Sequence, residues 1–369
     1  MDVLVTGSNG FIGKNLVERL GRLEDVKVLT FDKEDRPESL KEKALSADFI
    51  FHLAGVNRPE KTEEFYEGNR DLTKHLTDIL ATNGRKTPLL MSSSIQAERD
   101  NDYGKSKREG EEVVKSYSAQ SGAAVYIYRL PNVFGKWSKP NYNTVIATWC
   151  YNIIREIPIH IDDENLKLNL VYIDDVVEHF TRHLDENGRS GVLYPDISPV
   201  YEKTLGEIHT LLQMFKKSRE TLLVPHVGRG FERALYATYL SFLPKNGFSY
   251  ELKGHRDERG TFYEFLKTLD SGQFSVSTTA PGVTRGNHYH NTKNEKFLVV
   301  KGKASIKLRH IHSDEIVEYE ASDEKMEVFE MIPGYTHEIT NVGDEEMILL
   351  IWSNEIYDPE NPDTHYLKV

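Results

Sequence analysis

The chain of 369 residues contains a single cysteine, Cys150, and no apolar run that reaches the roughly 18 residues of a membrane-spanning helix. One cysteine excludes an intrachain disulfide, which fits a reducing compartment. The first residues lead directly into a strand pattern without a basic segment, so we expect neither a signal peptide nor a membrane span. The expected location is therefore the cytoplasm.

Positive charge is also scarce in this sequence. Against 58 Asp and Glu residues there are 46 Lys and Arg residues, which gives a formal net charge of −12. Such a protein repels polyanions unless basic residues gather locally. The longest basic cluster, Lys216, Lys217 and Arg219, lies among helix-forming residues and is typical of a solvated helix end. We therefore expect no nucleic-acid partner.

The length predicts two domains, because domains usually span about 100 to 200 residues. From residue 2 to about residue 135, short apolar runs alternate with amphipathic helical stretches, the rhythm of a parallel sheet covered on both faces. Segment 243–247 combines helix-ending and turn residues, and β-branched and aromatic residues alternate beyond it. We predict an α/β Rossmann domain with a substrate-binding insert over residues 1–243, and an all-β sandwich or barrel over residues 244–369.

A glycine-rich turn follows the first predicted strand, residues 3–5. Its glycines recur every three residues and lead into a helix, so that the backbone and the helix N-terminus can approach a pyrophosphate. A glycine triplet alone could be only a tight turn, but the strand-turn-helix setting favours a dinucleotide. The expected cofactor contacts on this turn are Gly7, Ser8, Asn9, Gly10, Phe11, Ile12 and Gly13.

Asp32 ends the second predicted strand, about 25 residues after the turn, where a carboxylate can accept hydrogen bonds from the adenosine ribose. Lys33 and Arg36 stand beside it and could hold a 2′-phosphate. NADPH is the expected cofactor, and NADH is left open.

Tyr103 and Lys107 are four residues apart on a predicted helix, residues 103–118, and therefore share one face. The ammonium can then lie near the phenol and lower its pKa, which makes the phenol usable as a proton donor to a carbonyl. Taken alone, this pair is common and is usually an exposed helix pair. Here it follows a strand that ends in three serines, residues 92–94, whose hydroxyls could polarise the same carbonyl.

Together these features resemble the extended short-chain dehydrogenases/reductases over about residues 1–243. The resemblance rests on the glycine turn, His52-Leu53-Ala54-Gly55, Asn69, the serine run, Tyr103 with Lys107, and the segment from Arg129 to Gly135. It implies that Tyr103 is the catalytic acid, that Lys107 is its partner and a ribose ligand, and that Ser94 polarises the carbonyl. Because the spacing from Ser94 to Tyr103 is shorter than usual in this family, Ser92 or Ser93 stays open for that role. The family also implies a nucleotide-linked sugar as substrate, further cofactor contacts at Leu53, Ala54 and Gly55, and substrate contacts at Asn132 and Asn143.

A second candidate site lies near the C-terminus. His288 and His290 are two residues apart, so in a strand both imidazoles leave the same face, and Glu295 and His337 can join them if the strands fold back into a barrel. Three imidazoles and a carboxylate suit zinc, iron, manganese or nickel, with zinc as our first expectation. The alternative is that these are ordinary polar positions on strands.

The spacing Gly282-x5-His288-x-His290-x4-Glu295-x6-Gly302 resembles the first motif of the cupin family at every position, and His337 and Asn341 keep half of the second motif. This resemblance implies a cupin β-barrel that binds one divalent metal through the three histidines and the glutamate. Residues 257–264 resemble the entry motif of cupin-fold epimerases that act on deoxysugar nucleotides. That likeness implies phosphate contacts by Arg259 and Arg285, with surface ion pairing as the alternative.

Over essentially its whole length the chain resembles the bifunctional enzymes of bacterial capsular polysaccharide assembly, in which a reductase is fused to a cupin. The resemblance implies a UDP-4-keto-6-deoxy-N-acetylhexosamine whose C3 is inverted by the cupin. The C4 ketone is then reduced to UDP-N-acetyl-6-deoxy-L-talosamine, a precursor of UDP-N-acetyl-L-fucosamine. This order follows because the C4 ketone acidifies the proton on C3.

Two alternatives stay open. In the first, the cupin is only a dimerisation and sugar-binding module, and the enzyme is a reductase alone. In the second, the N-terminal domain is a 4,6-dehydratase or a C4 epimerase that retains NAD⁺. A homodimer is expected by analogy with other barrel domains of this type.

Overall fold

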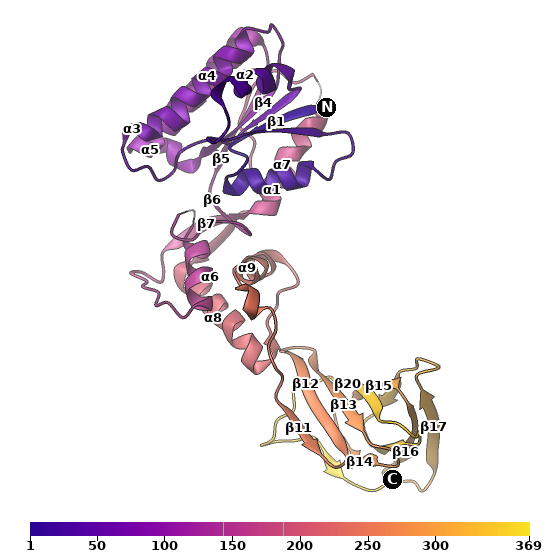
Figure 1. Ribbon diagram of the computed structural model, residues 1–369. Coiled ribbons are helices and arrows are strands. Elements are labelled where there is room, and N and C mark those ends of the chain that lie inside the picture. The colour runs from indigo at the N-terminus through magenta and orange to yellow at the C-terminus, as the bar shows by residue number, and fades with distance from the viewer. Residues whose placement is uncertain (143, 187) are drawn as a thin grey trace. The chain divides into compact units, whose positions relative to one another are not determined.

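The computed structural model describes residues 1–142, 144–186 and 188–369 and divides into two compact units. The N-terminal unit comprises Met1–Leu212 and Gly228–Leu243, and the C-terminal unit comprises Gln213–Val227 and Pro244–Val369. The first combines helices with a parallel sheet, and the second consists mainly of antiparallel strands (Figure 1). Asn143, one of the expected substrate contacts, lies outside the described residues.

The N-terminal unit is built on a six-stranded sheet in the order β2-β1-β3-β4-β5-β8, in which all neighbours are parallel. The strand order reverses direction between β1 and β3, and in such sheets ligands bind outside the carboxyl ends of the strands at this point. The strands are β1 (Asp2–Thr6), β2 (Lys27–Phe31), β3 (Phe49–His52), β4 (Leu89–Ser94), β5 (Ala124–Leu130) and β8 (Gly191–Leu193).

Helices cover both faces of this sheet (Figure 1). Val3 and Val5 of β1 pack in one core cluster with α1 and α7, whereas Leu4 between them packs in a second cluster with α2, α4 and α5. The alternation follows from the opposite directions of successive side chains in a strand. The helices are α1 (Phe11–Leu20), α2 (Pro37–Ser46), α4 (Leu72–Ala81), α5 (Asp102–Ser121) and α7 (Ile173–Arg182).

The helical stretch between β3 and β4 contains an irregular turn. Helix α3 (Glu63–Tyr66) continues into a π-helical turn (Glu67–Asp71) before α4 begins. The turn places Asn69 in the interior, where its side chain pairs with the backbone N–H and carbonyl of Val56 at 3.0 Å each. The single-turn 3₁₀ helices span Ile95–Glu98, His183–Asp185 and Lys245–Gly247.

The later part of the N-terminal unit is the insert expected beyond the regular β-α rhythm. It contains a three-stranded sheet in the order β6-β7-β9 together with helices α6 and α9 and the first part of α8. The bounds are β6 (Asn132–Phe134), β7 (Lys167–Tyr172), β9 (Tyr201–Thr204), α6 (Val145–Ile154), α8 (Leu205–Thr221) and α9 (Gly230–Leu240).

The C-terminal unit is a barrel of two sheets. One sheet has the order β10-β12-β13-β20-β15-β18, with β11 also on β12, and the other has the order β17-β16-β19-β14-β21. Buried apolar residues such as Phe297, Ile306 and Leu349 fill the space between them. The strands are β10 (Leu223–Val224), β11 (Gly254–Asp257), β12 (Gly260–Thr268), β13 (Gly272–Thr279), β14 (Thr284–Tyr289), β15 (Glu295–Lys301), β16 (Lys303–His310), β17 (Ile316–Ser322), β18 (Phe329–Met331), β19 (Tyr335–Asn341), β20 (Met347–Ser353) and β21 (His365–Tyr366).

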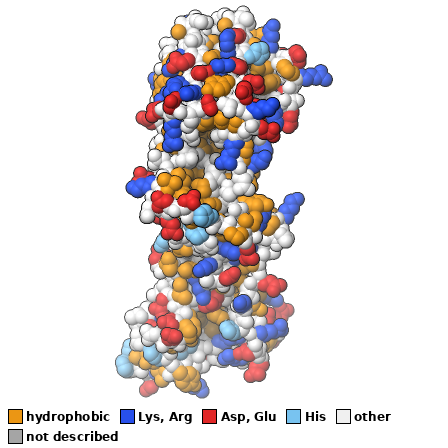
Figure 2. Space-filling view, turned by 90° about the vertical axis from the view of Figure 1, so that its left-hand side faces the viewer, with side chains coloured by type: hydrophobic (Ala, Val, Ile, Leu, Met, Phe, Trp, Pro, Cys, Tyr) orange, Lys and Arg blue, Asp and Glu red, His pale blue; other side chains and the backbone are white. Residues whose placement is uncertain are grey.

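The surface carries both signs of charge in close alternation. Figure 2 shows Lys and Arg side chains interspersed with Asp and Glu side chains on the face that it presents. Among the described residues, no helix is both long enough and apolar enough to cross a membrane.

Candidate functional site

The glycine turn joins the end of β1 to α1 by close backbone packing. Gly7 has a φ of +69°, and a Cβ added there would lie 2.7 Å from the backbone nitrogen of Ala54 on the neighbouring segment. A Cβ at Gly13 would lie only 2.1 Å from the carbonyl oxygen of Gly7. The first N–H groups of α1 have no partner within the helix, so the turn presents donors to an anion.

A cleft of about 630 Å³ opens beside this turn. Its lining includes Gly7, Gly10, Phe11, Ile12 and Gly13 from the turn, and Leu53 and Gly55 from the end of β3. Ala54, which stands between them, is not part of the lining. Its N–H donates to Oγ1 of Thr6 at 3.3 Å. The expected cofactor contacts of the turn and of β3 therefore meet at one edge of the sheet.

A second cavity, of about 390 Å³, lies beside Ser8, Asn9 and Asp32. The carboxylate of Asp32 accepts the backbone N–H groups of Asn9 at 2.7 Å and of Lys33 at 2.8 Å, which fixes it next to the turn. Three further carboxylates, those of Glu18, Glu34 and Asp35, and one ammonium, that of Lys14, also line this cavity, whereas Lys33 and Arg36 do not. Carboxylates therefore predominate over basic groups around Asp32. A site for a 2′-phosphate would be expected to have more basic groups.

Tyr103, Lys107 and Ser94 line the 630 Å³ cleft together with the glycine turn. Tyr103 is in the first turn of α5, one turn before Lys107, and Ser94 ends β4. The phenol forms a side-chain hydrogen bond with Ser94, and the ammonium of Lys107 donates to the carbonyl oxygen of Ser92 at 3.4 Å. A Cβ at Gly55 would come within 2.9 Å of that ammonium, so the glycine leaves room for Lys107.

The pKa of Tyr103 departs from the expectation that Lys107 lowers it. Burial raises the pKa of Tyr103 above 10.0, and only the hydrogen bond with Ser94 acts in the opposite direction. Burial also lowers the pKa of Lys107 from 10.5 to about 8, because a desolvated ammonium is costly. The phenol is therefore held in its protonated form, which is the form that a proton donor requires.

Two hydroxyls of the serine run, those of Ser93 and Ser94, have different partners. Ser93 donates to Glu111 at 2.6 Å, and Glu111 is fully buried and paired with Arg129 at 2.7 Å. Ser94 faces Tyr103 instead, while its Oγ also accepts the N–H of Gln96 at 3.1 Å. Of the alternatives left open by the sequence, this geometry favours Ser94 over Ser93.

Residues of the insert and of connecting segments also line the cleft. Asn132, an expected substrate contact, lines the cleft, and its amide donates to the carbonyl oxygen of Asn169 at 3.2 Å. Arg99, Thr144 and Lys167 also line it and were not singled out from the sequence. They lie in connecting segments and in the insert, where no spacing pattern marks them.

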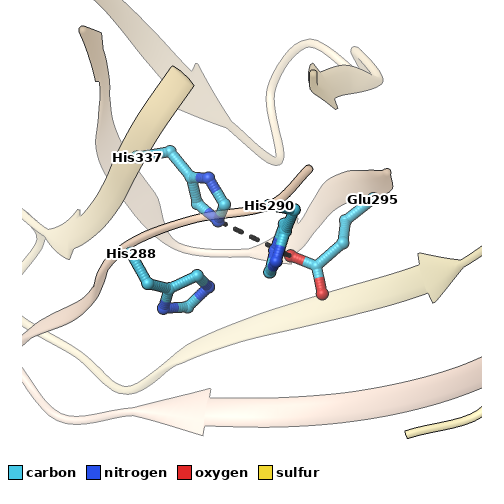
Figure 3. Close-up of side chains that lie close together, drawn as sticks. All are labelled: His288, His290, Glu295 and His337. Atoms are coloured by element: carbon cyan, nitrogen blue, oxygen red, sulfur yellow. Dashed lines mark ion pairs between the residues drawn. The ribbon is translucent and has the colours of Figure 1, made fainter. Parts of the chain in front are cut away.

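The four expected metal ligands, His288, His290, Glu295 and His337, come together in the barrel with one potential ligand atom each within 4.8 Å of the others (Figure 3). His288 pairs directly across the strands with His337, after a register shift in β14. Glu295 enters from the other sheet as the first residue of β15. Two sheets thus supply the cluster.

The electrostatics of this cluster fit a cation. Nε2 of His290 lies 3.4 Å from Glu295, and Nε2 of His337 lies 3.5 Å from it. Both nitrogens are buried without a hydrogen-bond partner that satisfies normal geometry, which is unusual for polar atoms. Burial opposes ionisation of Glu295, but the contacts with the two histidines and with Lys293 hold its pKa well below 4.5. Burial and the neighbouring His337 lower the pKa of His288 to about 4, so its imidazole is neutral and can act as a ligand.

Arg259 and Arg285 are less alike than the sequence suggests. Arg259 is exposed and holds Asp257 through two side-chain hydrogen bonds of 2.9 and 2.6 Å. Arg285 is half-buried and donates to Thr279 and to the carbonyl oxygen of Thr278. Burial lowers the pKa of Arg285, and the charge of Arg259 adds to this effect while Asp257 opposes it, so the two guanidinium groups lie near each other with one carboxylate beside them.

Comparison with known proteins places this architecture. Residues 3–194, more than half of the chain, match the NAD dependent epimerase/dehydratase family. The chain belongs to the NAD dependent epimerase/dehydratase family. Residues 255–365 match the polysaccharide biosynthesis C-terminal domain. Membership of the first family implies a nicotinamide dinucleotide as the cofactor of the N-terminal unit.

Individual relatives of the family agree over the full length. The chain is 52% identical to the UDP-2-acetamido-2,6-beta-L-arabino-hexul-4-ose reductase of Pseudomonas aeruginosa, over 100% of this chain and 99% of that protein. The crystal structure of the capsular polysaccharide assembling protein CapF from Staphylococcus aureus superposes with a TM-score of 0.93 at 48% identity and covers 100% of both chains. The predicted fold, a Rossmann domain followed by a cupin barrel, is confirmed.

A solved structure of lower sequence identity shows the fold alone. The UDP-glucuronic acid 4-epimerase from Bacillus cereus, solved in complex with NAD, has a TM-score of 0.56 at 16% identity. The match covers 68% of this chain and 100% of that one. The N-terminal architecture is therefore shared with proteins that lack the same sequence.

Proposed function

We propose that the chain reduces the C4 ketone of a UDP-linked 6-deoxy-N-acetylhexosamine with a nicotinamide cofactor, and that its barrel inverts C3 of the same 4-keto sugar beforehand. The observation that carries the reductase is the cleft in which Tyr103, Ser94 and Lys107 face the glycine turn. The full-length similarity to a protein named as a UDP-sugar reductase supports the substrate class. The product proposed from the sequence is UDP-N-acetyl-6-deoxy-L-talosamine, for capsular polysaccharide.

The glycine turn would hold the reduced nicotinamide dinucleotide, which would supply a hydride, one proton with two electrons, to C4 and be oxidised, while the π electrons of the carbonyl move to its oxygen. Tyr103 supplies the proton to that oxygen, since burial keeps its phenol protonated. Ser94 stabilises the developing charge by a hydrogen bond. The phenolate is then reprotonated from solvent.

NADPH stays the prediction from the sequence, but because of the carboxylates around Asp32 we propose instead that NADH binds more tightly than NADPH. A 2′-phosphate beside Asp32, Glu34 and Asp35 would meet like charge, whereas a 2′-hydroxyl can donate to a carboxylate. Asp32→Ala should narrow the preference for NADH by about tenfold, because a hydrogen bond to a charged group contributes about 1.5 kcal/mol. Dissociation constants for both cofactors measure this, and a wild-type preference for NADPH would contradict it.

For the barrel, we propose proton exchange at C3. The C4 ketone acidifies the C3–H bond, so a base can remove the proton to give an enolate, and return of a proton to the opposite face inverts the centre. Arg259 and Arg285 supply positive charge for the diphosphate of the substrate. Once C4 is reduced this acidity is gone, so the exchange precedes the reduction.

The residues that would hold a metal are His288, His290, Glu295 and His337, and the unpartnered Nε2 atoms of two of them fit this role. A divalent cation bound there, zinc being our first expectation, supplies Lewis-acid stabilisation of a substrate oxygen. Deep burial of His290 and His337 also favours a second candidate, in which the ion only fixes the barrel. The enzyme would then be a reductase without epimerase activity.

Proton NMR in heavy water tests the two proposed activities separately. UDP-4-keto-6-deoxy-N-acetylhexosamine is incubated with the protein, first without nicotinamide and then with it. We expect loss of the C3 proton signal in the first sample, and stoichiometric cofactor oxidation with a new C4 proton signal in the second. Reduction of C4 without deuterium exchange at C3 would support the reductase activity and contradict the epimerase activity. Cofactor that cycles without net oxidation would instead indicate a dehydratase or a C4 epimerase.

Three further expectations accompany this proposal. We expect a homodimer, which sedimentation tests. We expect a cytoplasmic location, which fractionation of the producing cells tests. We expect no binding of nucleic acid, which a DNA mobility assay tests. The interspersed charges of Figure 2 support the last of these.

A further inference from the structure

The last residues of the chain, Asp363–Val369, lie against the barrel next to the histidine cluster, and we call this segment the C-terminal strap. Its strand β21 pairs with β14, where His288 is opposite Tyr366. The N–H of Leu367 donates to the carbonyl oxygen of Asn287 at 3.0 Å, which extends the same pairing. The strap is therefore a further strand beside the one that carries the first histidine.

Asp363 is the most connected residue of the strap. Its carboxylate accepts the backbone N–H groups of Asn291 at 2.9 Å, Thr292 at 2.7 Å and Lys293 at 2.8 Å, and the hydroxyl of Thr292 at 3.1 Å. Burial opposes its ionisation, but these donors hold the pKa of Asp363 well below its usual range. The three N–H groups belong to the loop that joins His290 to Glu295, so one carboxylate fixes the segment between two members of the cluster.

The backbone carbonyl of Asp363 contacts the cluster itself. It forms a hydrogen bond with Nδ1 of His290, and since a carbonyl oxygen can only accept, Nδ1 must carry the proton. In the neutral imidazole that a metal requires, Nε2 then carries the lone pair, and this is the nitrogen that lies 3.4 Å from Glu295. An outer hydrogen bond of this kind sets both the tautomer and the ring orientation of a ligating histidine.

The strap also contacts strands of the barrel beyond β14. The hydroxyl of Thr336, the residue before His337, donates to the carbonyl oxygen of Leu367. Arg309 on β16 donates to the carbonyl oxygen of Lys368 at 2.7 Å. Each of the three histidines of the cluster therefore either contacts the strap itself or is adjacent in sequence to a residue that does.

We infer that Asp363 is a positioning residue for the cluster, and that the C-terminal strap sets the affinity and geometry of metal binding there. The inference rests on the proposed metal site, but it concerns residues outside the ligand set. Asp363 acts through the loop and through His290 and touches no substrate. Removing its carboxylate frees three N–H groups and lets the loop between His290 and Glu295 relax.

Titration of the metal-free protein with Co²⁺ alone, followed by visible absorption, tests this inference. Asp363→Ala should bind Co²⁺ about 10- to 100-fold more weakly than wild type, as for other outer-shell partners of ligating histidines. The absorption bands of the bound ion should also change, because they report coordination geometry and not the stability of the fold. The matched control is Asp323→Ala, which removes an exposed carboxylate that accepts the N–H of Gly302 at 3.0 Å elsewhere in the barrel.

The outcomes separate this inference from the proposed function. Wild-type protein that binds no Co²⁺ overturns the metal site and the inference with it. Wild-type binding with unchanged affinity and spectrum in Asp363→Ala overturns the role of Asp363 alone. If Asp363→Ala does not fold, Asp363→Asn decides, since it keeps the size of the side chain and one acceptor oxygen. A weaker Co²⁺ affinity of that variant supports the inference, and an unchanged affinity overturns it.

Discussion

The cleft of the N-terminal unit includes in its lining the glycines of the turn after β1, whereas the cluster of the C-terminal unit consists of four side chains from two sheets. In the first, function depends on what is left out, because a Cβ at Gly7 or Gly13 would meet backbone atoms. In the second, it depends on donor atoms within 4.8 Å of one another. One site is therefore sensitive to added atoms and the other to removed ones.

Loss of the Tyr103 hydroxyl should give the largest loss of activity. This loss should affect only the reaction of the N-terminal unit. Tyr103→Phe is expected to lower kcat for ketone reduction by about 10²- to 10⁴-fold, the usual contribution of general acid catalysis. Stopped-flow oxidation of the reduced cofactor measures it, and deuterium exchange at C3 should not change. Tyr66→Phe, which alters an exposed tyrosine bonded to Asp102, is the control. Undiminished cofactor oxidation would show that another group delivers the proton.

Loss of a cluster imidazole should act on the opposite unit. His290→Ala removes a proposed ligand and is expected to lower metal affinity by more than about 100-fold, which is the upper end of the effect of changing a residue that only contacts a ligand. It is also expected to abolish proton exchange at C3. Metal analysis and the heavy-water experiment measure the two effects, and His312→Ala tests an exposed histidine outside the cluster. Exchange that persists in metal-free protein would reduce the ion to a structural role.

An added methyl group should damage the glycine-lined cleft. Gly13→Ala places a Cβ 2.1 Å from the carbonyl oxygen of Gly7, so the turn or the helix must move. We expect a loss of about 1–3 kcal/mol in the free energy of unfolding, and weaker cofactor binding. Calorimetry measures both, with Gly228→Ala as control because its added Cβ meets nothing within 4 Å. Equal cofactor affinity in Gly13→Ala would argue against a pyrophosphate at this turn.

The smallest expected effect concerns the buried ammonium of the cleft. The pKa of Lys107 is about 8 in the folded protein and 10.5 when exposed, so the unfolded chain binds more protons between these pH values. The free energy of unfolding therefore decreases as pH falls from about 10.5 to about 8, because over this range protons bind to Lys107 more readily in the unfolded chain. Lys107→Met should raise the melting temperature of cofactor-free protein at pH 7 by about 2–4 °C.

That difference should shrink as pH rises toward 10.5, the pKa of the exposed side chain. Exposed Lys105, which pairs with Asp100 at 3.1 Å, provides the control substitution to Met. Thermal melts over the pH series decide the matter, and a lower melting temperature for Lys107→Met at pH 7 would mean that its contacts outweigh the cost of burying the charge.

Much of the N-terminal unit could be predicted because its signals are local. The strand ending at Thr6, the glycines of the turn and helix α5 lie in contiguous stretches, and parallel strands bring their ends to one edge. The π-helical turn at Asn69 could not be predicted, because it depends on a pairing with Val56 that sequence periodicity does not carry. The raised pKa of Tyr103 likewise reflects burial, which the four-residue spacing to Lys107 does not reveal.

The barrel was predictable through its ligand spacing and less through its strands. The histidine positions identified the cluster, but short or polar strands such as β11, β18 and β21 lack the alternation that marks a strand. Asp363 lies about 70 residues from the loop that it holds, and no motif connects them. Its role follows only from the folded arrangement.

Helix α8 leads out of one unit and into the other before the chain returns through α9. Beyond α8, β10 pairs in parallel with the end of β12, Leu223 with Lys267 and Val224 with Thr268. A fragment that starts at Pro244 would leave this edge strand behind, and a fragment that ends at Leu243 would carry it without its neighbour. The two units are consequently interleaved along the polypeptide, so separating them for study calls for rejoining segments instead of a single cut.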